Sequence, residues 1–458
     1  MIRQLGALTA ALSLLLLSAP APLAGALTPP TVDPAALPPD GPPSPEQPMR
    51  KNSDCTFNGA LPGFDPAAVP PSQEMLNLPA AWKISRGRGV AVAVIDSGVS
   101  PQPRLPTLQP GGDYIDPAAE GLVDCDGHGT VVAGIIAGQP ADDGFSGVAP
   151  EAGLVSIRQT SLHWAPKQPS GDDPQKAKTA GSVATLARAV RHAADIPFVR
   201  VINISVTNCI AEYKQVDQAA LGAALRYAMI DKDIVVVAAA GNNSENNCRS
   251  NPLMDPNNPQ DPRNWAGATT ISTPSYWQPY VLSVAALTPQ GQPSNFTMAG
   301  PWVGIAAPGE HIVSLGNAPD SGLVNGQPSD KEPLVPINGT SFAAAYVSGV
   351  AALLRSTFPD LSARQIINRI VSSAHNGARA PSNLVGAGVI DPAAALTWDI
   401  PEGQQLPATM PVVRVEPPAP PPPDNRLPRM IAFGAGILAI AAAVITVAAI
   451  GRRRGNNS

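Results

Sequence analysis

The sequence predicts an α/β domain built on a parallel sheet that helices cover on both faces. Three observations lead to this prediction. Short apolar runs alternate with longer helical stretches, polar residues follow several of those runs, and the segments of unusual composition lie at the two ends of the chain. Alternating strands and helices favour a parallel sheet, because each crossover between parallel strands needs a long connection, usually a helix.

The strand candidates are continuous apolar runs, which suit strands buried on both faces. They are residues 90–95, 153–157, 199–206, 234–240 and 281–286. The helical stretches are residues 128–138, 181–195, 216–231 and 340–357. Ligands of such sheets bind beyond the carboxyl ends of the strands. Asp96, Ser205 and Asn242 lie at or just past such ends, so we expect the functional site there.

Length and composition bound the class of protein. Of the 458 residues, 44% are hydrophobic, which is ample for a core, and 14% are charged. The net charge of −5 gives no attraction to nucleic acid. The 54 prolines cluster at the two ends, which marks those segments as lying outside the core domain.

Residues 1–26 have the pattern of a secretory signal peptide. Arg3 precedes a leucine-rich apolar run, and Ala24-Gly25-Ala26 supplies a small-residue cleavage site. An N-terminal membrane anchor is the alternative, but the apolar run is short for one. Residues 27–75 follow as a Pro-rich N-terminal extension, which we expect to be extended over 27–50. Nothing in it is long or patterned enough to be a folded prodomain.

The C-terminal part predicts a membrane anchor. Residues 401–429 form a Pro-rich linker, which is stiff and extended. Residues 430–450 carry no charge and, as a helix, are long enough for a hydrocarbon core of about 30 Å. A basic tail, residues 451–458, follows with three arginines. The positive-inside rule then places the tail in the cytoplasm and the large domain outside.

Cys55, Cys125, Cys209 and Cys248 are the four cysteines. An even number in an exported protein suggests disulfides, and four cysteines allow three connectivities. Cys209 and Cys248 each follow a strand of the predicted sheet, and parallel strands finish at one edge, so a 209–248 bridge is favoured and leaves 55–125. Reduced thiols are the alternative. Metal binding is disfavoured, because no pair has CxxC spacing.

Three short motifs carry candidates for chemistry. Asp96 ends an apolar run, His128 lies between two glycines where a helix begins, and Ser341 begins a helix of small residues. A helix N-terminus offers free N–H groups and a positive dipole, which favour the oxyanion that forms beside a nucleophilic serine. Each motif alone also fits an ordinary strand end, a structural histidine or an N-capped buried helix. Together, Asp, His and Ser occur in the order of the subtilisin triad.

The three motifs resemble the Asp, His and Ser blocks of the subtilisin-like serine proteases. A fourth block, Ile234–Asn242, resembles the strand and turn that carry the family's oxyanion-hole asparagine. The resemblance implies a subtilisin-like catalytic domain over residues 76–400. It implies that Ser341 is the nucleophile and His128 its general base.

The same resemblance implies that Asp96 orients the imidazole and that Asn242 stabilises the oxyanion. The alternative for Asn242 is an ordinary turn residue after Gly241. No cofactor is expected. Calcium sites occur in the family, but no acidic cluster predicts a metal site, and the other histidines receive no role.

Substrate specificity is less readable from the sequence. A Ser-Leu-Gly-Gly segment of subtilisin-like enzymes forms one wall of the cleft and pairs with the substrate, and the matching residues are Ser205, Val206, Thr207 and Asn208. Both glycines are replaced, and a Cβ at Thr207 narrows the pocket or restricts backbone approach, which predicts a slow or selective protease. The segments 158–180, 243–275 and 316–335 are expected to be surface loops, either for recognition or as flexible decoration.

The order of the segments narrows the resemblance to the mycosins, the membrane-anchored proteases associated with actinobacterial type VII secretion. The resemblance implies a cell-membrane enzyme with an extracytoplasmic catalytic domain, which cleaves secreted proteins or peptides and has the secretion complex as a partner. Two functions stay open: a serine endopeptidase with few substrates, or chiefly a structural component of that complex with secondary protease activity. The complete triad favours the first, and the altered cleft wall and long loops favour the second as an added role.

Overall fold

The computed structural model describes residues 27–168, 180–214, 216–243, 248–375, 377, 381–403 and 435–447. The chain divides into two units, Met1–Val413 and Arg414–Ser458. In the second unit, residues 435–447 are helical. Within the described ranges, no helix is both long and apolar enough to cross a membrane. The predicted signal peptide, most of the Pro-rich linker, the rest of the predicted span and the basic tail lie outside the described residues.

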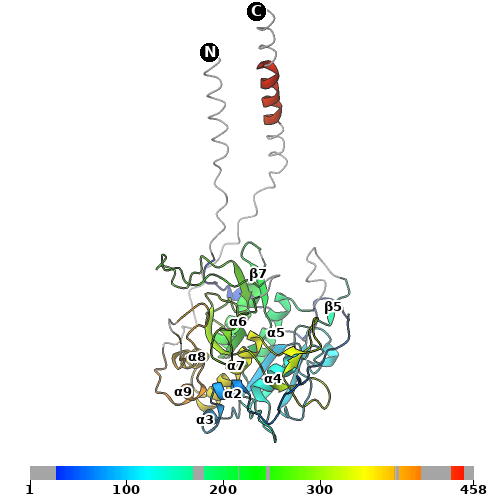
Figure 1. Cartoon of the computed structure of the whole chain (residues 1–458), viewed down its shortest axis with the longest axis vertical. Helices are drawn as coiled ribbons and strands as arrows, with labels where there is room; N and C mark the ends of the chain where they lie inside the picture. Colours follow the sequence, from blue (N-terminus) through cyan, green and yellow to red (C-terminus); the bar gives the residue numbers. More distant parts are fainter. Residues whose placement is uncertain are drawn as a thin grey trace, which may run out of the picture. The chain divides into compact units, whose positions relative to one another are not determined.

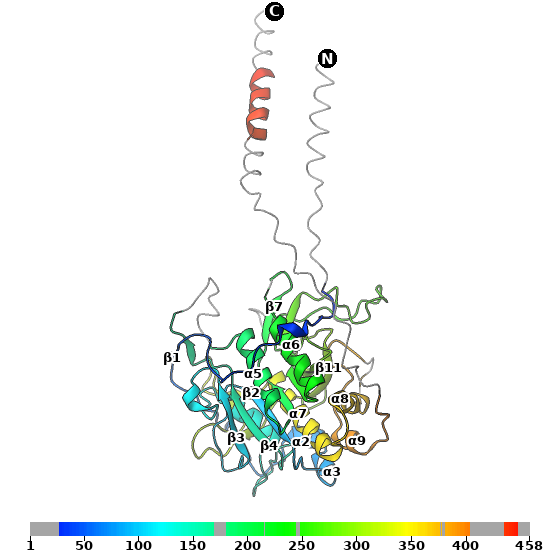
Figure 2. The same cartoon turned by 180° about the vertical axis from the view of Figure 1, so that it is seen from behind.

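A parallel sheet of seven strands forms the centre of the first unit (Figures 1 and 2). The spatial order is β11-β10-β8-β6-β2-β4-β3, and each neighbouring pair is parallel. The bounds are β2 Ala91–Asp96, β3 Leu108–Asp113, β4 Gly153–Arg158, β6 Val199–Ile204, β8 Val235–Ala239, β10 Leu282–Leu287 and β11 Val303–Pro308. The predicted parallel sheet is therefore confirmed, and β2, which ends in Asp96, lies between β4 and β6.

All five predicted strands are present, with ends shifted by one or two residues. The two strands of this seven-stranded sheet that were not predicted, β3 and β11, are its two edges. β3 contains Pro110, Gly111 and Gly112, and its pairing with β4 is irregular there. β11 ends in Pro308. Proline and glycine weaken a strand pattern in the sequence, but edges tolerate both.

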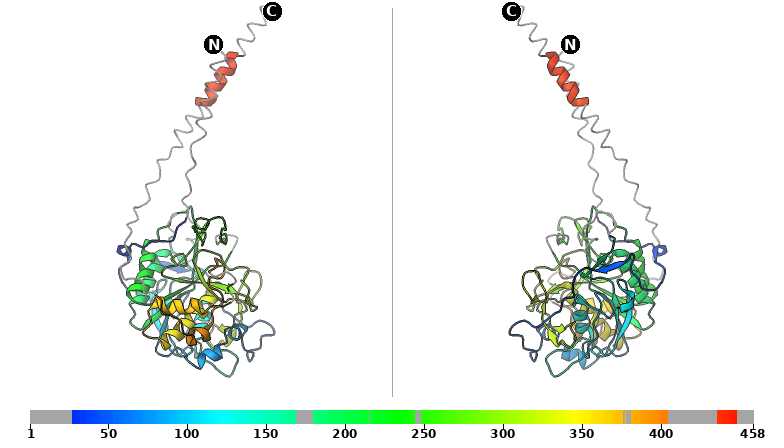
Figure 3. Two further views of the ribbon diagram at one scale, coloured as in Figure 1. Left: turned by 90° about the vertical axis from the view of Figure 1, so that its left-hand side faces the viewer. Right: turned by 90° about the vertical axis from the view of Figure 1, so that its right-hand side faces the viewer.

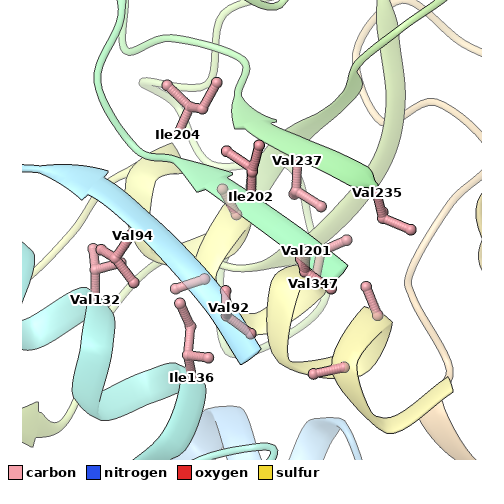
Figure 4. Packing of buried hydrophobic residues seen from close by; sticks show 14 of the residues in the cluster. Val92, Val94, Val132, Ile136, Val201, Ile202, Ile204, Val235, Val237 and Val347 are labelled. Carbon is pink, nitrogen blue, oxygen red and sulfur yellow. The ribbon is translucent and has the colours of Figure 1, made fainter. Parts of the chain in front are cut away.

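The major helices flank the sheet in two contacting pairs, one on each face (Figures 2 and 3). The first pair is α4 His128–Ala137 and α7 Thr340–Thr357, and the second is α5 Val183–Asp195 and α6 Ala219–Arg226. All four fall on predicted helical stretches, although a π-helical turn, Tyr227–Asp231, replaces the end of the third. Figure 4 shows valine and isoleucine side chains of α4, α7 and the central strands in one buried cluster.

Smaller elements complete the first unit. The short helices are η1 Pro34–Ala36, α2 Pro71–Met75, α3 Leu78–Trp82, η2 Pro117–Ala119, α8 Ala363–Ser372 and α9 Pro392–Thr397. The short strands are β1 Met49–Lys51, β5 Trp164–Pro166, β7 Asn208–Ala211, β9 Thr270–Thr273, β12 Ser314–Leu315, β13 Leu323–Val324, β14 Gly326–Gln327 and β15 Val335–Pro336. The three segments expected to be surface loops therefore contain short strands.

The N-terminal extension packs on the large domain instead of forming a core of its own. β1 pairs antiparallel with β5, in the first of the predicted loop segments. Further along, Gly59 forms a β-bridge with Gly326 in the third. Val32 and Leu37 pack against the main core. The extension thus joins regions of the domain that are far apart in the sequence.

Candidate active site

Asp96 and His128 meet where a strand ends and a helix begins. Asp96 is the last residue of β2 and is fully buried, and His128 is the first residue of α4. The imidazole Nδ1 lies 2.7 Å from Asp96 Oδ1. This approach requires glycine at position 129, because a Cβ there would lie 2.0 Å from the carbonyl oxygen of Gly98. The Gly-His-Gly sequence therefore lets α4 begin directly against the end of β2.

Three carboxylates set the electrostatics of His128. Burial lowers the pKa of the imidazole. The charge and the hydrogen bond of Asp96, together with the charges of Asp124 and Asp126, raise it by more, so the net pKa lies above the usual histidine value. The imidazolium form is therefore stabilised by its surroundings. A general base needs this property, because it is protonated as its substrate reacts.

Ser341 is the second residue of α7 and is almost completely buried, with 8% of its surface exposed. Its Oγ donates a hydrogen bond of 2.9 Å to the carbonyl oxygen of Ser205, whose Oγ donates one of 2.8 Å to the carbonyl oxygen of Ser341. The ring of Phe342, the next residue, lies 5.2 Å from the His128 ring between centroids. The fold thus brings the helix of Ser341 against His128, although the hydroxyl bonds to Ser205 in this structure.

Asn242 lies three residues past β8, beside the start of α7. Its Oδ1 accepts hydrogen bonds from the backbone N–H and the hydroxyl of Thr340, at 3.0 and 2.9 Å. A backbone N–H only donates, so the atom that accepts from it is the amide oxygen, and the amide orientation is fixed. The Nδ2 group lies on the side of Gly339, 3.5 Å from where a Cβ on that residue would stand. Nδ2 and the backbone N–H of Ser341, at the N-terminus of α7, are suitable donors for an oxyanion.

The residues expected to form the cleft wall follow β6 directly. Ser205 is buried, and Val206 and Thr207 are partly exposed. Asn208 then begins β7, which pairs antiparallel with β9. The wall is therefore a short segment held at one end by the main sheet and at the other by a small one.

The structure contains the two disulfides Cys55–Cys125 and Cys209–Cys248, the connectivity expected from the sequence. The first joins the N-terminal extension to the loop three residues before His128. The second joins β7, beyond the cleft wall, to the segment that follows Asn242. Across the described ranges, no three or more His, Cys, Asp or Glu residues are grouped so as to hold a metal ion.

Sequence reasoning missed the residues that support the histidine loop. Asn317 Nδ2 donates to the carbonyl oxygens of Thr56 and Asp124, at 2.9 and 3.0 Å, and its Oδ1 accepts from the N–H of Asn58. Asn58 Nδ2 donates to the carbonyl oxygen of Gly127 at 2.8 Å. Asp124 could have been noticed inside the Asp-Cys-Asp-Gly-His motif, but no sequence signal links Asn58 and Asn317, which are distant in the chain.

Residues 87–388 match the model of the subtilase family, Peptidase_S8. The chain therefore belongs to the subtilase family and is a subtilisin-like serine protease.

Within that family it is a mycosin. Mycosin-3 of Mycobacterium tuberculosis is 54% identical to it over 443 residues, which cover 94% of this chain and 95% of the relative. Mycosin-1 of Mycolicibacterium smegmatis is 46% identical over 441 residues, covering 94% and 96%.

Solved structures agree with this placement. The MycP3 protease from the type VII (ESX-3) secretion system is 59% identical, with a TM-score of 0.78, and the match covers 81% of this chain and 100% of that one. A chain in the intact ESX-5 inner membrane complex is 48% identical, also with a TM-score of 0.78, and the match covers 92% of this chain and 100% of that one.

Proposed function

We propose that Asp96, His128 and Ser341 form the catalytic triad of a serine endopeptidase that cleaves a limited set of secreted proteins. The observation that carries the proposal is the 2.7 Å hydrogen bond between Asp96 and His128, beside a serine at the N-terminus of a buried helix. In this scheme Ser341 Oγ turns from Ser205 toward His128, which takes its proton as Oγ attacks the peptide carbonyl. His128 then returns the proton to the leaving amine.

The oxyanion forms beside Ser341, where Asn242 Nδ2 and the Ser341 N–H stabilise it. Asp96 holds Nδ1 of the imidazole, so Nε2 faces the serine. The peptide substrate pairs with the segment of Ser205, Val206 and Thr207. Thr207 and the following Asn208 stand in place of the two glycines of the subtilisin-like pattern, and their side chains support a slow or selective enzyme.

The proposed location is the cell membrane, with the catalytic domain outside and the tail, residues 451–458, in the cytoplasm. The supports are the signal-peptide pattern of residues 1–26, the uncharged residues 430–450 and the arginines that follow. The Pro-rich residues 401–429 act as a spacer between the domain and the anchor.

The proposed partner is a type VII secretion membrane complex. The support comes from relatives: one of the structures at 49% identity is the periplasmic assembly from the ESX-5 inner membrane complex. The same observation favours a second candidate function, in which the chain chiefly stabilises such a complex and proteolysis is secondary.

Replacement of Ser341 by alanine in cells tests both candidates, with processing of secreted proteins and secretion itself scored separately. Loss of both would mean that export needs proteolysis. Loss of processing with intact secretion would mean that Ser341 is catalytic and that any contribution to export is structural. If neither changes, Ser341 is not an essential nucleophile. Normal assembly of the complex in cells that lack the whole protein would contradict the structural role.

A further inference from the structure

Asp124 is a second buried carboxylate behind the Asp96–His128 pair. Its Oδ2 accepts hydrogen bonds from the backbone N–H and the hydroxyl of Thr130, at 2.8 and 2.7 Å. Its Oδ1 accepts from the N–H of Gly127 at 2.8 Å and from the N–H of Asp126 at 3.2 Å. The backbone N–H groups at these contacts can only donate, so they are satisfied by an ionised carboxylate.

These bonds give α4 the cap that its own sequence lacks. The N-cap residue, Gly127, has no side chain to accept from the helix N–H groups. Asp124 accepts from Thr130 N–H instead, and Ser97 Oγ accepts from Gly129 N–H at 3.0 Å. N-terminal caps stabilise a helix by giving partners to N–H groups that have none within the helix. The helix capped in this way begins with His128, so the two acceptors fix the backbone that carries the imidazole.

Ser97 also connects the two carboxylates. Its Oγ lies 2.9 Å from Asp124 Oδ1 and 3.2 Å from Asp96 Oδ1. The Ser97 hydroxyl has one proton to donate, which goes to one carboxylate or the other, while its oxygen accepts from Gly129 N–H. In the described part of the chain, Asp96 Oδ2 is buried without a hydrogen-bond partner. The hold on Asp96 therefore passes through Oδ1, which His128, Ser97 N–H and the Ser97 hydroxyl share.

From this geometry we infer that Asp124 is a positioning residue for the proposed catalytic reaction, acting through Ser97 and the first turn of α4 to hold Asp96 and His128 and to stabilise the imidazolium. The inference rests on the proposed triad. Asp124 does not touch the reacting atoms, and its effect is exerted on the base. The ionisable groups around it are Asp96, Asp126 and His128, while Thr56, Asn58 and Asn317 reach this loop with uncharged groups.

The environment of Asp124 determines the pH range in which its carboxylate acts on His128. The pKa of Asp124 is raised to about 6, chiefly by burial and also by the charges of Asp126 and Asp96, although the hydrogen bonds from Thr130 lower it. The carboxylate is therefore ionised above that pH and becomes neutral below it. The support for the imidazolium is strongest in the neutral and alkaline range, where the base works.

The experiment compares the full-length wild type with Asp124→Asn and Ser97→Ala. The probe is a fluorophosphonate, whose phosphorus bonds to a nucleophilic serine Oγ as fluoride leaves, so no natural substrate is needed. We expect Asp124→Asn to slow labelling about tenfold or more and to move its acid limb to lower pH. Ser97→Ala should slow labelling several-fold with a smaller shift of that limb. Asp143→Asn is the matched control. Asp143 lies in the loop after α4 and pairs with Arg104, so this variant also loses a paired carboxylate, but one outside the Asp96–His128 contacts.

A second readout does not depend on catalysis. In a Ser341→Ala background, NMR titration of the His128 ring, assigned with a His128→Gln variant, should show a pKa lower by about half a unit or more when Asp124 is replaced by Asn. A folded Asp124→Asn protein with the wild-type labelling rate and an unchanged His128 pKa would overturn the inference. If that variant does not fold, wild-type labelling by Ser97→Ala overturns it.

The proposed triad and the proposed role of Asp124 are tested separately. Absence of labelling in the wild type, or equal labelling of Ser341→Ala, contradicts the proposed triad. In that case the histidine titration still decides whether Asp124 holds His128.

Discussion

On one side of the candidate active site, carboxylates surround His128 and fix the helix that carries it, whereas on the other side Ser341 and Asn242 are held by neutral groups. The first side uses Asp96, Asp124 and Asp126. The second uses the reciprocal serine–carbonyl bonds and the contacts of Thr340 with Asn242. A hydrogen bond to a charged group contributes about 1.5–3 kcal/mol, and a neutral one about 0.5–1.5 kcal/mol.

The difference assigns separate sensitivities to the two sides. The geometry and activity of the first side should respond to charge and pH, because its hydrogen bonds involve ionised carboxylates. The second should respond to shape, because its helix is buried along nearly its whole length and built from small residues. Each side can therefore be disturbed without changing the kind of interaction that holds the other.

The largest effect should follow from the loss of the Asp96 charge. Asp96→Asn keeps the shape of the side chain but removes the negative charge that stabilises the imidazolium formed when His128 takes the serine proton. We expect the rate of peptide hydrolysis to fall by about 10⁴-fold, as measured by kcat at saturating substrate. Retention of more than about a tenth of the activity would mean that Asp96 does not orient the base.

Asn242→Ala tests the neutral side. Removal of the Nδ2 donor should reduce kcat by about 10²–10³-fold with little change in KM, because the lost bond forms in the transition state. The acid limb of the pH profile should not move, since no charge is altered. A pure KM effect would mean that Asn242 binds substrate and does not stabilise the oxyanion.

Thr340→Val should have a smaller effect of the same kind. The β-branched shape remains, but one of the two donors that fix the Asn242 oxygen is lost. We expect kcat to fall about tenfold, since a loosened donor costs part of its contribution. Thr340→Ser, which restores the hydroxyl, is the control. If the Val variant keeps the wild-type rate, the hydroxyl does not position Asn242; if the Ser variant is as slow as the Val variant, the methyl group contributes as well.

The smallest expected effect concerns pH. A base with a raised pKa stays protonated, and inactive, up to a higher pH. The acid limb of kcat/KM should therefore have its midpoint above about 6.5, the usual histidine value. At pH 6.5 the wild type should be less than half active, which titration of initial rates measures directly. A midpoint at or below 6.5 would contradict the net effect of the carboxylates.

Sequence patterns predicted the central strands and helices because these are long, apolar and periodic. They also indicated Asp96, His128, Ser341 and Asn242, since each lies beside a glycine, at a strand end or at the start of a helix. Patterns did not predict edge strand β3, where Pro110 and two glycines interrupt the apolar signal. Nor could they indicate the Asn58–Asn317 contact, because its two residues come from distant segments and an asparagine alone carries no signal for its partner.

The reciprocal bonds between Ser205 and Ser341 have a thermodynamic consequence. The proposed nucleophile rests on the carbonyl of the residue that begins the proposed substrate-binding wall. A peptide that shifts that wall on binding also changes the free energy of the resting serine, and by linkage a serine turned toward His128 changes the affinity for the peptide. Peptide binding in the cleft and rotation of Ser341 toward His128 are then coupled in one equilibrium. An empty cleft favours the conformation in which Ser341 bonds to the carbonyl of Ser205.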